Sequence, residues 1–221
     1  MRLHILVEGQ TEEGFVKTIL APHLAHVHVW AVPIIVMTSK APGGKRQKGG
    51  GDWLKWKRHL DILLGENPGE GVRVTTLFDL YGLPGNFPGL GEARKQTNTV
   101  ARVGALEHAM AAAVEDRRFI PYIQRHEMEA LVLVNLDSLA ALVEPDDGVD
   151  ALRADIGDMA PEDVNCGDET APSKRLIRFV PGYQKVLHGP AVMEATGLPK
   201  LRAACPRFNG WVSMLEALGA P

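Results

Sequence analysis

Two short apolar runs constrain the fold most strongly, because each of them stops at a carboxylate. Arg2–Val7 (RLHILV) precedes Glu8, and Val72–Phe78 (VRVTTLF) precedes Asp79. Runs of this length, rich in aliphatic and β-branched residues and bounded by polar or glycine-containing segments, are typical of buried strands. The sequence therefore predicts a sheet in which two buried strands each lead directly into an acidic residue.

Between and after these two runs, several segments have apolar residues at helical spacing, and two more segments have the pattern of strands. The expected helices are Thr11–Leu20, Trp53–Leu64, Thr99–Asp116 and Glu127–Val134, and the expected further strands are His28–Met37 and Phe119–Gln124. We expect Thr11 to cap the first helix, since a hydroxyl followed by two acids suits a helix N-terminus. Strands that alternate with helices indicate an α/β fold around a mostly parallel sheet.

The second half of the chain has a different pattern. The polar segment 146–172 is expected to be rich in loops, and helical spacing returns at Lys174–Val180, Ala191–Gly197 and Pro206–Leu218. We therefore expect one α/β domain over residues 1–221, with a helical C-terminal part (173–221) packed on it.

The acids at the expected strand ends are the strongest chemical signal. Ligands of parallel sheets bind beyond the carboxyl ends of the strands, where Glu8, Asp79 and the pair Glu127 and Glu129 would lie. Converging carboxylates repel each other, and a hard divalent cation such as Mg²⁺ (or Mn²⁺) relieves this repulsion. The alternative is that each acid only forms a turn or caps a helix.

Charge is distributed unevenly along the 221 residues, although the formal net charge is only −3. Lys40–Arg58 and Ser173–Arg207 each hold seven basic residues and one acid, while Glu115–Glu169 holds fifteen acids and four bases. Such basic segments could contact a polyanion despite the slightly acidic average.

Several classes of protein are disfavoured by the sequence. The two cysteines, Cys166 and Cys205, form no metal-ligand spacing, and no signal peptide or membrane-length apolar run is recognisable, so a cytoplasmic protein without a membrane partner is expected. His126–Ala130 (HEMEA) lacks the second histidine of a zinc protease, and Gly43–Lys45 lacks the remaining residues of a P-loop.

Five segments carry a resemblance to known families. Val7–Gly9 (VEG), after a strand and before a helix, resembles the first motif of Toprim domains, which occur in topoisomerases, primases and overcoming-lysogenization-defect nucleases. The segments FDLYGLP (78–84), IPYIQRHEMEAL (120–131), APSKRL (171–176) and PGYQKVLHGP (181–190) together resemble the bacterial family DUF4276. The resemblance spans residues 1–218 and implies a Toprim-like (Rossmann-like) fold with a divalent-metal site.

The resemblance also implies roles for individual acids. Glu8 corresponds to the general acid/base or metal-ligand glutamate of Toprim enzymes, and Asp79 to the first aspartate of their D-x-D motif. Tyr81 stands in place of the second aspartate. Glu127 or Glu129 is expected to supply the missing ligand, with Glu129 favoured because an apolar residue precedes it. Glu12 is a further candidate ligand.

Basic residues are the expected substrate contacts. Lys174 is assigned a catalytic role beside the acids, and the residues expected to hold phosphate are Arg175, Lys185, His188, Lys45, Arg46 and Lys48. The alternatives are a solvated helix face for the C-terminal residues and a surface loop for residues 45–48.

The sequence therefore favours a metal-dependent enzyme that acts on phosphodiester bonds, with nucleic acid as its partner. The resemblance extends this to a nuclease of an anti-phage or mobile-element module that works with a separate ATPase. A catalytically degenerate Toprim-like module that binds nucleotide, nucleic acid or protein is the alternative, favoured by Tyr81. The sequence leaves open whether the chain forms a homo-oligomer.

Overall fold

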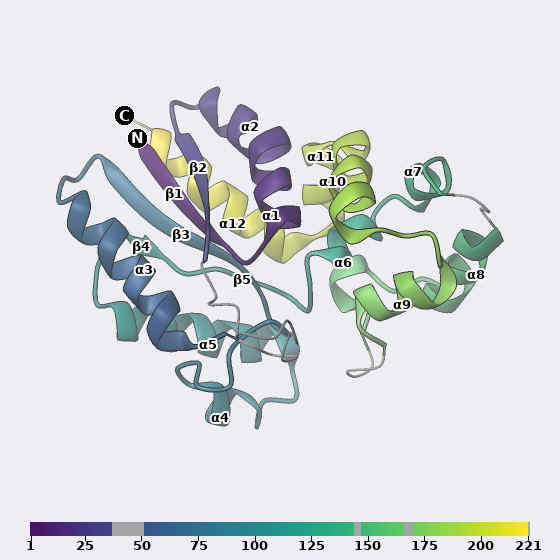
Figure 1. Cartoon of the computed structure of the whole chain (residues 1–221), viewed down its shortest axis with the longest axis horizontal. Helices are drawn as coiled ribbons and strands as arrows, with labels where there is room; N and C mark the ends of the chain where they lie inside the picture. The colour runs from purple at the N-terminus through teal and green to yellow at the C-terminus, as the bar shows by residue number, and fades with distance from the viewer. Residues whose placement is uncertain (37–50, 144–146, 166–169, 221) are drawn as a thin grey trace, which may run out of the picture.

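The computed structural model describes residues 1–36, 51–143, 147–165 and 170–220. Its centre is a five-stranded sheet in the order β2-β1-β3-β4, with β5 also paired to β3 (Figure 1). The strands are β1 (Arg2–Val7), β2 (Trp30–Ile35), β3 (Val72–Asp79), β4 (Phe119–Ile120) and β5 (Ile123–Gln124). Every strand pair is parallel. The expected α/β fold with a mostly parallel sheet is confirmed.

Strand register brings the two acids of the sequence pattern to one edge of the sheet. Val7 pairs with Leu77, and Asp79, the last residue of β3, pairs with Gln124 of β5. Glu8 follows β1 directly. Because parallel strands all run the same way, the residues that follow them meet at the carboxyl edge.

The expected strand Phe119–Gln124 forms as two short strands rather than one. Pro121 lies between β4 and β5 and has no N–H to donate to a neighbouring strand. Two hydroxyl groups of β3 bind the segment on both sides of Pro121: Thr75 donates to Ile120 O (2.6 Å), and Thr76 donates to Tyr122 O (2.7 Å).

The first helix begins differently from the prediction. Gly9, not Thr11, is the N-cap of α1 (Gln10–Phe15), and Thr11 lies inside the helix with 3% of its surface exposed. The helix continues through a π-helical turn, η1 (Val16–Leu20), into α2 (Ala21–Ala25). The expected helix end at Leu20 is wrong, because Pro22 does not stop the helix: it falls in the first turn of α2, where a missing N–H is tolerated.

Two hydrophobic clusters cover the two faces of the sheet, in keeping with the alternation of side chains along a strand. Leu3, Ile5 and Val7 of β1 face one cluster, which includes α1 and α12 (Pro206–Glu216). Leu6 faces the other cluster, which is formed with α3 (Trp53–Glu66), α4 (Leu90–Ala93) and α5 (Thr99–Val114).

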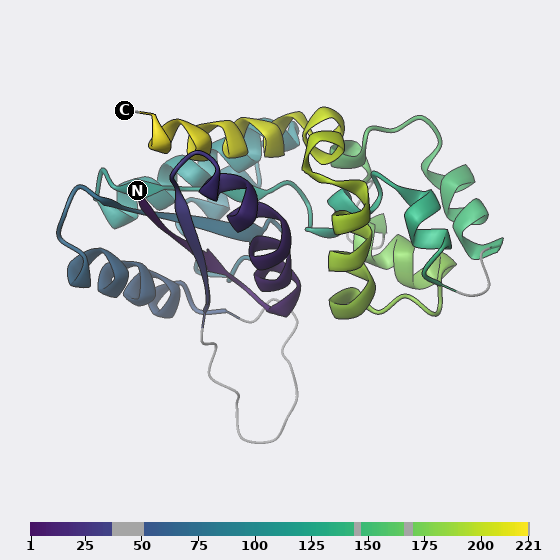
Figure 2. The same ribbon diagram turned by 90° about the horizontal axis from the view of Figure 1, so that it is seen from above.

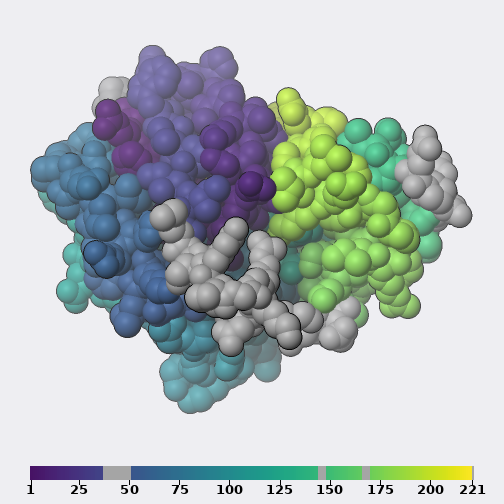
Figure 3. All heavy atoms as spheres, viewed as in Figure 1, coloured from purple at the N-terminus to yellow at the C-terminus, as the bar shows by residue number. Residues whose placement is uncertain are grey.

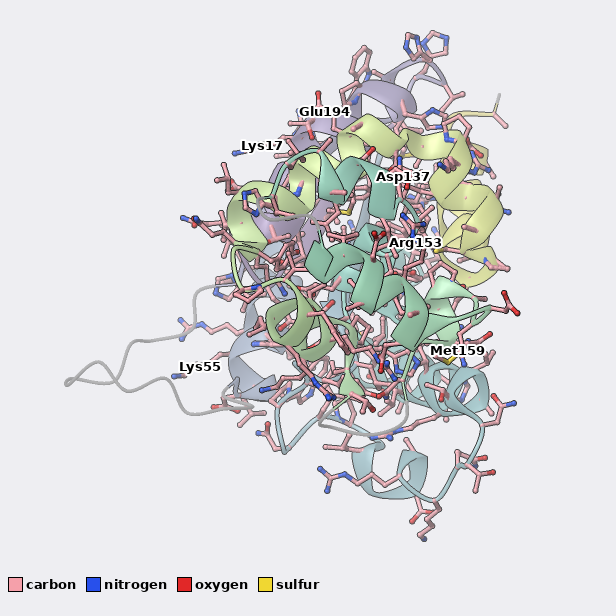
Figure 4. All side chains as sticks on the ribbon, turned by 90° about the vertical axis from the view of Figure 1, so that its right-hand side faces the viewer. Lys17, Lys55, Asp137, Arg153, Met159 and Glu194 are labelled. Carbon is pink, nitrogen blue, oxygen red and sulfur yellow. The ribbon has the colours of Figure 1, made fainter. Side chains whose placement is uncertain are left out.

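A helical lobe follows β5 and lies to the right of the sheet in Figure 1. It contains α6 (Glu129–Val132), α7 (Leu136–Ala140), α8 (Asp147–Ile156), η2 (Pro161–Asp163), α9 (Pro172–Phe179), α10 (Lys185–Thr196) and α11 (Leu198–Ala204). The expectation that segment 146–172 is mostly loop is wrong for its first part: α8 buries Val149, Leu152 and Ile156, a helical spacing within a polar sequence. Arg153 of α8 pairs with Asp137 of α7 at 2.6 Å on the outer side of the lobe (Figure 4).

The chain returns to the sheet through α12, which runs back toward the N-terminus (Figure 2) and ends in η4 (Ala217–Gly219). Trp211 of α12 stacks on Tyr122 with ring centroids 4.4 Å apart, and its Nε1 donates to Thr75 Oγ1 (3.0 Å). Phe208 meets Phe15 of α1 edge to face. These contacts join the C-terminal helices to the α/β core.

No helix within the described ranges is long and apolar enough to cross a membrane.

Candidate functional site

Glu8 and Asp79 meet although 71 residues separate them in the chain. The backbone N–H of Asp79 donates to Glu8 Oε1 at 2.6 Å. Gly82 makes room for this arrangement, because a Cβ at that position would overlap the Glu8 carboxylate. The acids predicted from two separate strand ends therefore share one location at the carboxyl edge of the sheet.

Two further acids complete the cluster from different elements. Glu12 lies in the first turn of α1 with 4% of its surface exposed, and Glu129 begins α6 with 1% exposed. Asp79 Oδ1 accepts the N–H of Met128 (2.8 Å), which fixes the start of α6 against the end of β3. The sheet edge, α1 and α6 thus each direct carboxyl groups to the same place.

Lys185, the first residue of α10, projects its ammonium group among these carboxylates. Its Nζ lies 3.0 Å and 3.1 Å from the two oxygens of Glu129, 3.7 Å from Asp79 Oδ2 and 3.9 Å from Glu12 Oε1. The Lys185 side chain remains 42% exposed, whereas those of Asp79, Glu12 and Glu129 are 12%, 5% and 1% exposed. The ammonium group therefore covers the cluster from its solvent side.

We call Glu8, Glu12, Asp79, Glu129 and Lys185 the acidic cluster. Glu127 and Glu129, between which the sequence left the choice of ligand open, have different partners in the structure. Glu129 belongs to the acidic cluster, whereas Glu127 accepts the backbone N–H and the hydroxyl of Ser173, both at 2.9 Å. Glu127 thus caps the first turn of α9 from outside the helix.

Burial and mutual repulsion raise the pKa values of the clustered acids. Burial, strengthened by the nearby charge of Glu12, raises the pKa of Glu8 to about 8. Burial also raises the pKa of Asp79 well above its usual value, although Lys185 opposes this, and it raises the pKa of Glu129. Burial lowers the pKa of Lys185, but the carboxylates of Asp79, Glu129 and Glu12 outweigh that effect and raise it. The site therefore disfavours several ionised carboxylates at once, and it stabilises either bound protons or a cation that balances their charge.

The donor set fits a hard divalent cation in its chemistry. All four acids offer carboxylate oxygens, the ligands that Mg²⁺ and Mn²⁺ prefer. Glu129 Oε1 is buried and accepts no hydrogen bond from the described residues, because its contact with Lys185 has poor geometry. Nevertheless, no three acidic, histidine or cysteine side chains in the described part of the chain are arranged to hold a metal ion. The ammonium group of Lys185 lies where the carboxylates converge.

Tyr183, two residues before Lys185, adds a polar group beside the cluster. It is 9% exposed, and its hydroxyl has no hydrogen-bond partner among the described residues. Burial, together with the charge of Glu129, raises its pKa. A buried hydroxyl without a partner is costly, so this group indicates a place where a bound ligand or water would be stabilised. Tyr183 was not among the site residues predicted from the sequence, although it belongs to the segment PGYQKVLHGP that resembles DUF4276.

Tyr81, which replaces an acid of the Toprim motif, takes part in a neighbouring polar group. Its hydroxyl contacts His126 Nδ1 (2.9 Å) and accepts from Asn165 Nδ2. His126 has a left-handed backbone (φ 66°), which is uncommon for a residue with a side chain, and burial lowers its pKa to about 4. Tyr81 thus joins β3 to the segment that precedes α9.

The other basic residues selected from the sequence occupy different places. Lys174 is exposed on α9. Arg175 is 7% exposed, and its guanidinium group pairs with Asp155 and donates to Thr170 O (2.9 Å). His188 Nδ1 accepts the backbone N–H of Gln184 (3.0 Å) at the start of α10. Lys45, Arg46 and Lys48 lie outside the described residues.

The fold and the cluster define a class: a parallel α/β protein with acids at the carboxyl edge of its sheet. Residues 7–216 match the family described as a domain of unknown function, DUF4276, and the chain belongs to that family. Among solved structures, the chain is similar to the C-terminal region of the OLD protein of Xanthomonas campestris pv. campestris. That likeness covers 96% of each chain with 14% sequence identity and a TM-score of 0.33. The comparison with curated proteins found no significant match.

Proposed function

We propose that this protein is a metal-dependent enzyme that acts on phosphodiester bonds, with Mg²⁺ or Mn²⁺ held by Glu8, Glu12, Asp79 and Glu129. The observation that carries the proposal is the convergence of these four carboxyl groups, from β1, α1, β3 and α6, at the carboxyl edge of the sheet. A divalent ion at such a site stabilises charge on a phosphoryl group and orients an attacking water. The Toprim-like motifs around Glu8 and Asp79 support the same chemistry.

Glu8 is the residue best suited to move a proton. In the metal-free chain its pKa of about 8 lies close to neutral pH, where a general acid or base works most effectively. Direct coordination of a divalent ion would lower this pKa, so Glu8 would act either as a ligand or as the proton carrier. One of its oxygens accepts the Asp79 N–H, which fixes the orientation of the carboxyl group. Glu8→Gln keeps this hydrogen bond in shape but cannot exchange a proton, so we expect it to abolish cleavage while the fold survives.

Lys185 and Lys174 are the proposed contacts for an anionic substrate. Lys185 lies at the solvent side of the carboxylates, and Lys174 lies exposed on α9, the helix whose first turn Glu127 caps. If nucleic acid is the substrate, Lys174→Ala should weaken its binding and flatten the dependence of binding on salt. Binding that is unchanged at every salt concentration would remove Lys174 from the substrate site.

The finer identity of the protein is proposed from the sequence resemblance. We propose a nuclease that acts in the cytoplasm, and that serves as the effector of an anti-phage or mobile-element module with a partner ATPase. The absence of a P-loop motif from the sequence is compatible with ATP hydrolysis by a separate protein.

The test is a titration with Mn²⁺, followed by calorimetry, of the wild-type chain, Asp79→Asn, Glu8→Gln and Glu13→Gln. Glu13 is the matched control, since it adjoins Glu12 but pairs with Lys17 (2.6 Å) outside the cluster. We expect Asp79→Asn and Glu8→Gln to weaken binding about tenfold or more, and Glu13→Gln to change it less than about twofold. Equal affinity in all four proteins would refute the proposed site.

A second function is favoured by one specific observation. Lys185 already neutralises part of the cluster, as expected of a degenerate module that binds a partner or nucleic acid without cleaving it. That alternative predicts no metal binding and no cleavage with Mg²⁺ or Mn²⁺. Binding of single- or double-stranded DNA or RNA in EDTA, unaffected by Asp79→Asn, would favour it.

A further inference from the structure

The position of Lys185 has a consequence for how a metal ion could bind. Its ammonium group is within 4 Å of three carboxylates that come from three different elements. A divalent cation bound by the same oxygens would have to lie where this ammonium group lies. Two positive charges at one place repel strongly in a partly buried site. The lysine and the metal are therefore competitors for one position.

We infer that Lys185 is an exchangeable counter-ion: it neutralises the acidic cluster while no metal is bound, and a divalent cation displaces it toward the solvent side. There the ammonium group would meet the anionic part of an incoming ligand, so that metal and anion bind with positive cooperativity. This inference rests on the proposed metal site and adds a role for a residue that the sequence assigned only to substrate.

The geometry of Lys185 is suited to such an exchange. Its side chain is 42% exposed although its Nζ reaches buried oxygens, so it has a path to solvent that does not require the backbone to move. The only hydrogen bond described for its ammonium group within the cluster is to Glu129 Oε2 (3.1 Å), while Asp79 and Glu12 are held at longer range. The lysine is therefore held mainly by charge, and a stronger charge can replace it.

The backbone around Lys185, by contrast, is firmly placed. The atoms of α10 adjoin those of α1 on the surface (Figure 3). In this contact, Pro190 approaches Gly14 and Gly189 lies against Thr11. A Cβ on Gly189 would approach the Tyr183 hydroxyl and the Thr11 methyl group at 3.3 Å and 3.4 Å. Because the helix start is fixed, the motion that exchanges the two cations is confined to the side chain of Lys185.

Tyr183 supplies an independent observation that a ligand belongs here. Its hydroxyl is buried and has no hydrogen-bond partner among the described residues. It lies close enough to Glu129 and Lys185 for the charge of both to act on its pKa. A displaced Lys185 and the Tyr183 hydroxyl would together present two donors, which suits a phosphate-bearing ligand.

The experiment compares the wild-type chain with Lys185→Met and the control Lys17→Met. Methionine keeps most of the length and the apolar stem of lysine but removes its charge. Lys17 is a lysine of the neighbouring helical segment that is 59% exposed, pairs with Glu13 and lies at the surface (Figure 4). Mn²⁺ affinity is measured by calorimetry, and thermal unfolding is measured in EDTA and in excess Mg²⁺.

For Lys185→Met we expect Mn²⁺ to bind about tenfold more tightly or better, because the competing charge is gone. In EDTA its unfolding temperature should fall below that of the wild-type chain, and excess Mg²⁺ should restore it. Lys17→Met should match the wild-type chain in both measurements. Inorganic phosphate should raise the Mn²⁺ affinity of the wild-type chain but not that of Lys185→Met.

The outcomes separate this inference from the proposed function. If the wild-type chain binds Mn²⁺ and Lys185→Met binds it equally or more weakly, the inference is wrong while the metal site stands. If only Lys185→Met binds Mn²⁺, the competition is supported, but the isolated wild-type chain is not a metal enzyme. If neither protein binds Mn²⁺, both the inference and the proposed metal site are overturned.

Discussion

Buried carboxylates occur in two regions of this molecule, and their partners differ. Around the start of α12, Glu162 accepts the backbone N–H groups of Arg207 (2.9 Å) and Phe208 (3.0 Å), which caps that helix. Glu107 nearby pairs with the Arg207 guanidinium group and accepts the Ile123 N–H (2.8 Å). Each of these acids has partners of its own. At the carboxyl edge of the sheet, Glu12, Asp79 and Glu129 lie within 4 Å of one ammonium group, and the charge of Glu8 acts on the same cluster.

The comparison separates carboxylates that hold the fold together from carboxylates that are available for chemistry. The region around the start of α12 also has a cavity of about 740 Å³. Its lining includes Arg125, Arg207, Glu162 and Asp163. Its two guanidinium groups are already paired, with Asp163 and Glu107. The charged groups that line this cavity therefore neutralise each other, unlike the crowded carboxylates of the proposed metal site.

The largest difference between the two regions should appear as pH changes. Raised pKa values of Glu8, Asp79 and Glu129 mean that the folded chain binds protons more tightly than the unfolded chain. The stability that these protons provide is complete below the ordinary pKa of about 4.5 and is lost as pH rises toward about 8. Each unit of pKa difference corresponds to about 1.4 kcal/mol.

We expect thermal unfolding in EDTA to show this trend, with the difference between the wild-type chain and Glu8→Gln growing from pH 5 to pH 8.5. As pH rises, Glu8 of the wild-type chain ionises in its buried position and destabilises the fold, whereas the glutamine of the variant cannot ionise. The variant should therefore become more stable relative to the wild-type chain. A difference between the two proteins that stays constant over this range would show that Glu8 does not titrate in the folded state as proposed.

Trp211→Ala tests whether the region around α12 contributes mainly to the stability of the fold. The side chain is 1% exposed, stacks on Tyr122 and donates to Thr75. We expect the free energy of unfolding to fall by about 3–5 kcal/mol, as for other large buried residues replaced by alanine. Met214→Ala is the control on the same helix, since Met214 is 50% exposed. This substitution should lower the free energy of unfolding by less than about 0.5 kcal/mol. Chemical denaturation of the metal-free proteins measures both.

The same chemical change at one acid of each region gives a more direct comparison. Glu162→Gln replaces one of two acceptor oxygens with an NH₂ group beside a backbone N–H. We expect the free energy of unfolding to fall by about 1–2 kcal/mol. Glu129→Gln removes a buried charge from a crowded acidic cluster and should leave stability in EDTA unchanged or slightly higher. Equal losses in the two variants would contradict the division into structural and functional carboxylates.

Sequence reasoning identified the fold because the apolar runs of β1 and β3 are long enough to be recognised without tertiary information. It also selected Glu8, Glu12, Asp79, Glu127 and Glu129 as candidate ligands, since a parallel sheet brings strand ends together. Of these, Glu127 caps α9 through Ser173 instead of contacting Lys185. It could not place Lys185 among them, because that contact depends on how α10 packs against α1, 56 residues after Glu129. The helix α8 was missed because its three buried residues are separated by aspartate, alanine and arginine residues in a polar segment.

A modest effect on stability, but an informative effect on the site, is expected from two glycines of one loop. A Cβ at Gly82 would overlap the Glu8 carboxylate, whereas a Cβ at Gly85 would meet nothing within 4 Å. Gly82→Ala should therefore displace Glu8 and weaken Mn²⁺ binding by about tenfold, with a loss of stability of about 1–2 kcal/mol. Gly85→Ala should leave the metal affinity unchanged. If calorimetry finds the same Mn²⁺ affinity in both variants, the position of Glu8 against Gly82 is not needed for the metal site, and only Glu12, Asp79 and Glu129 remain as proposed ligands.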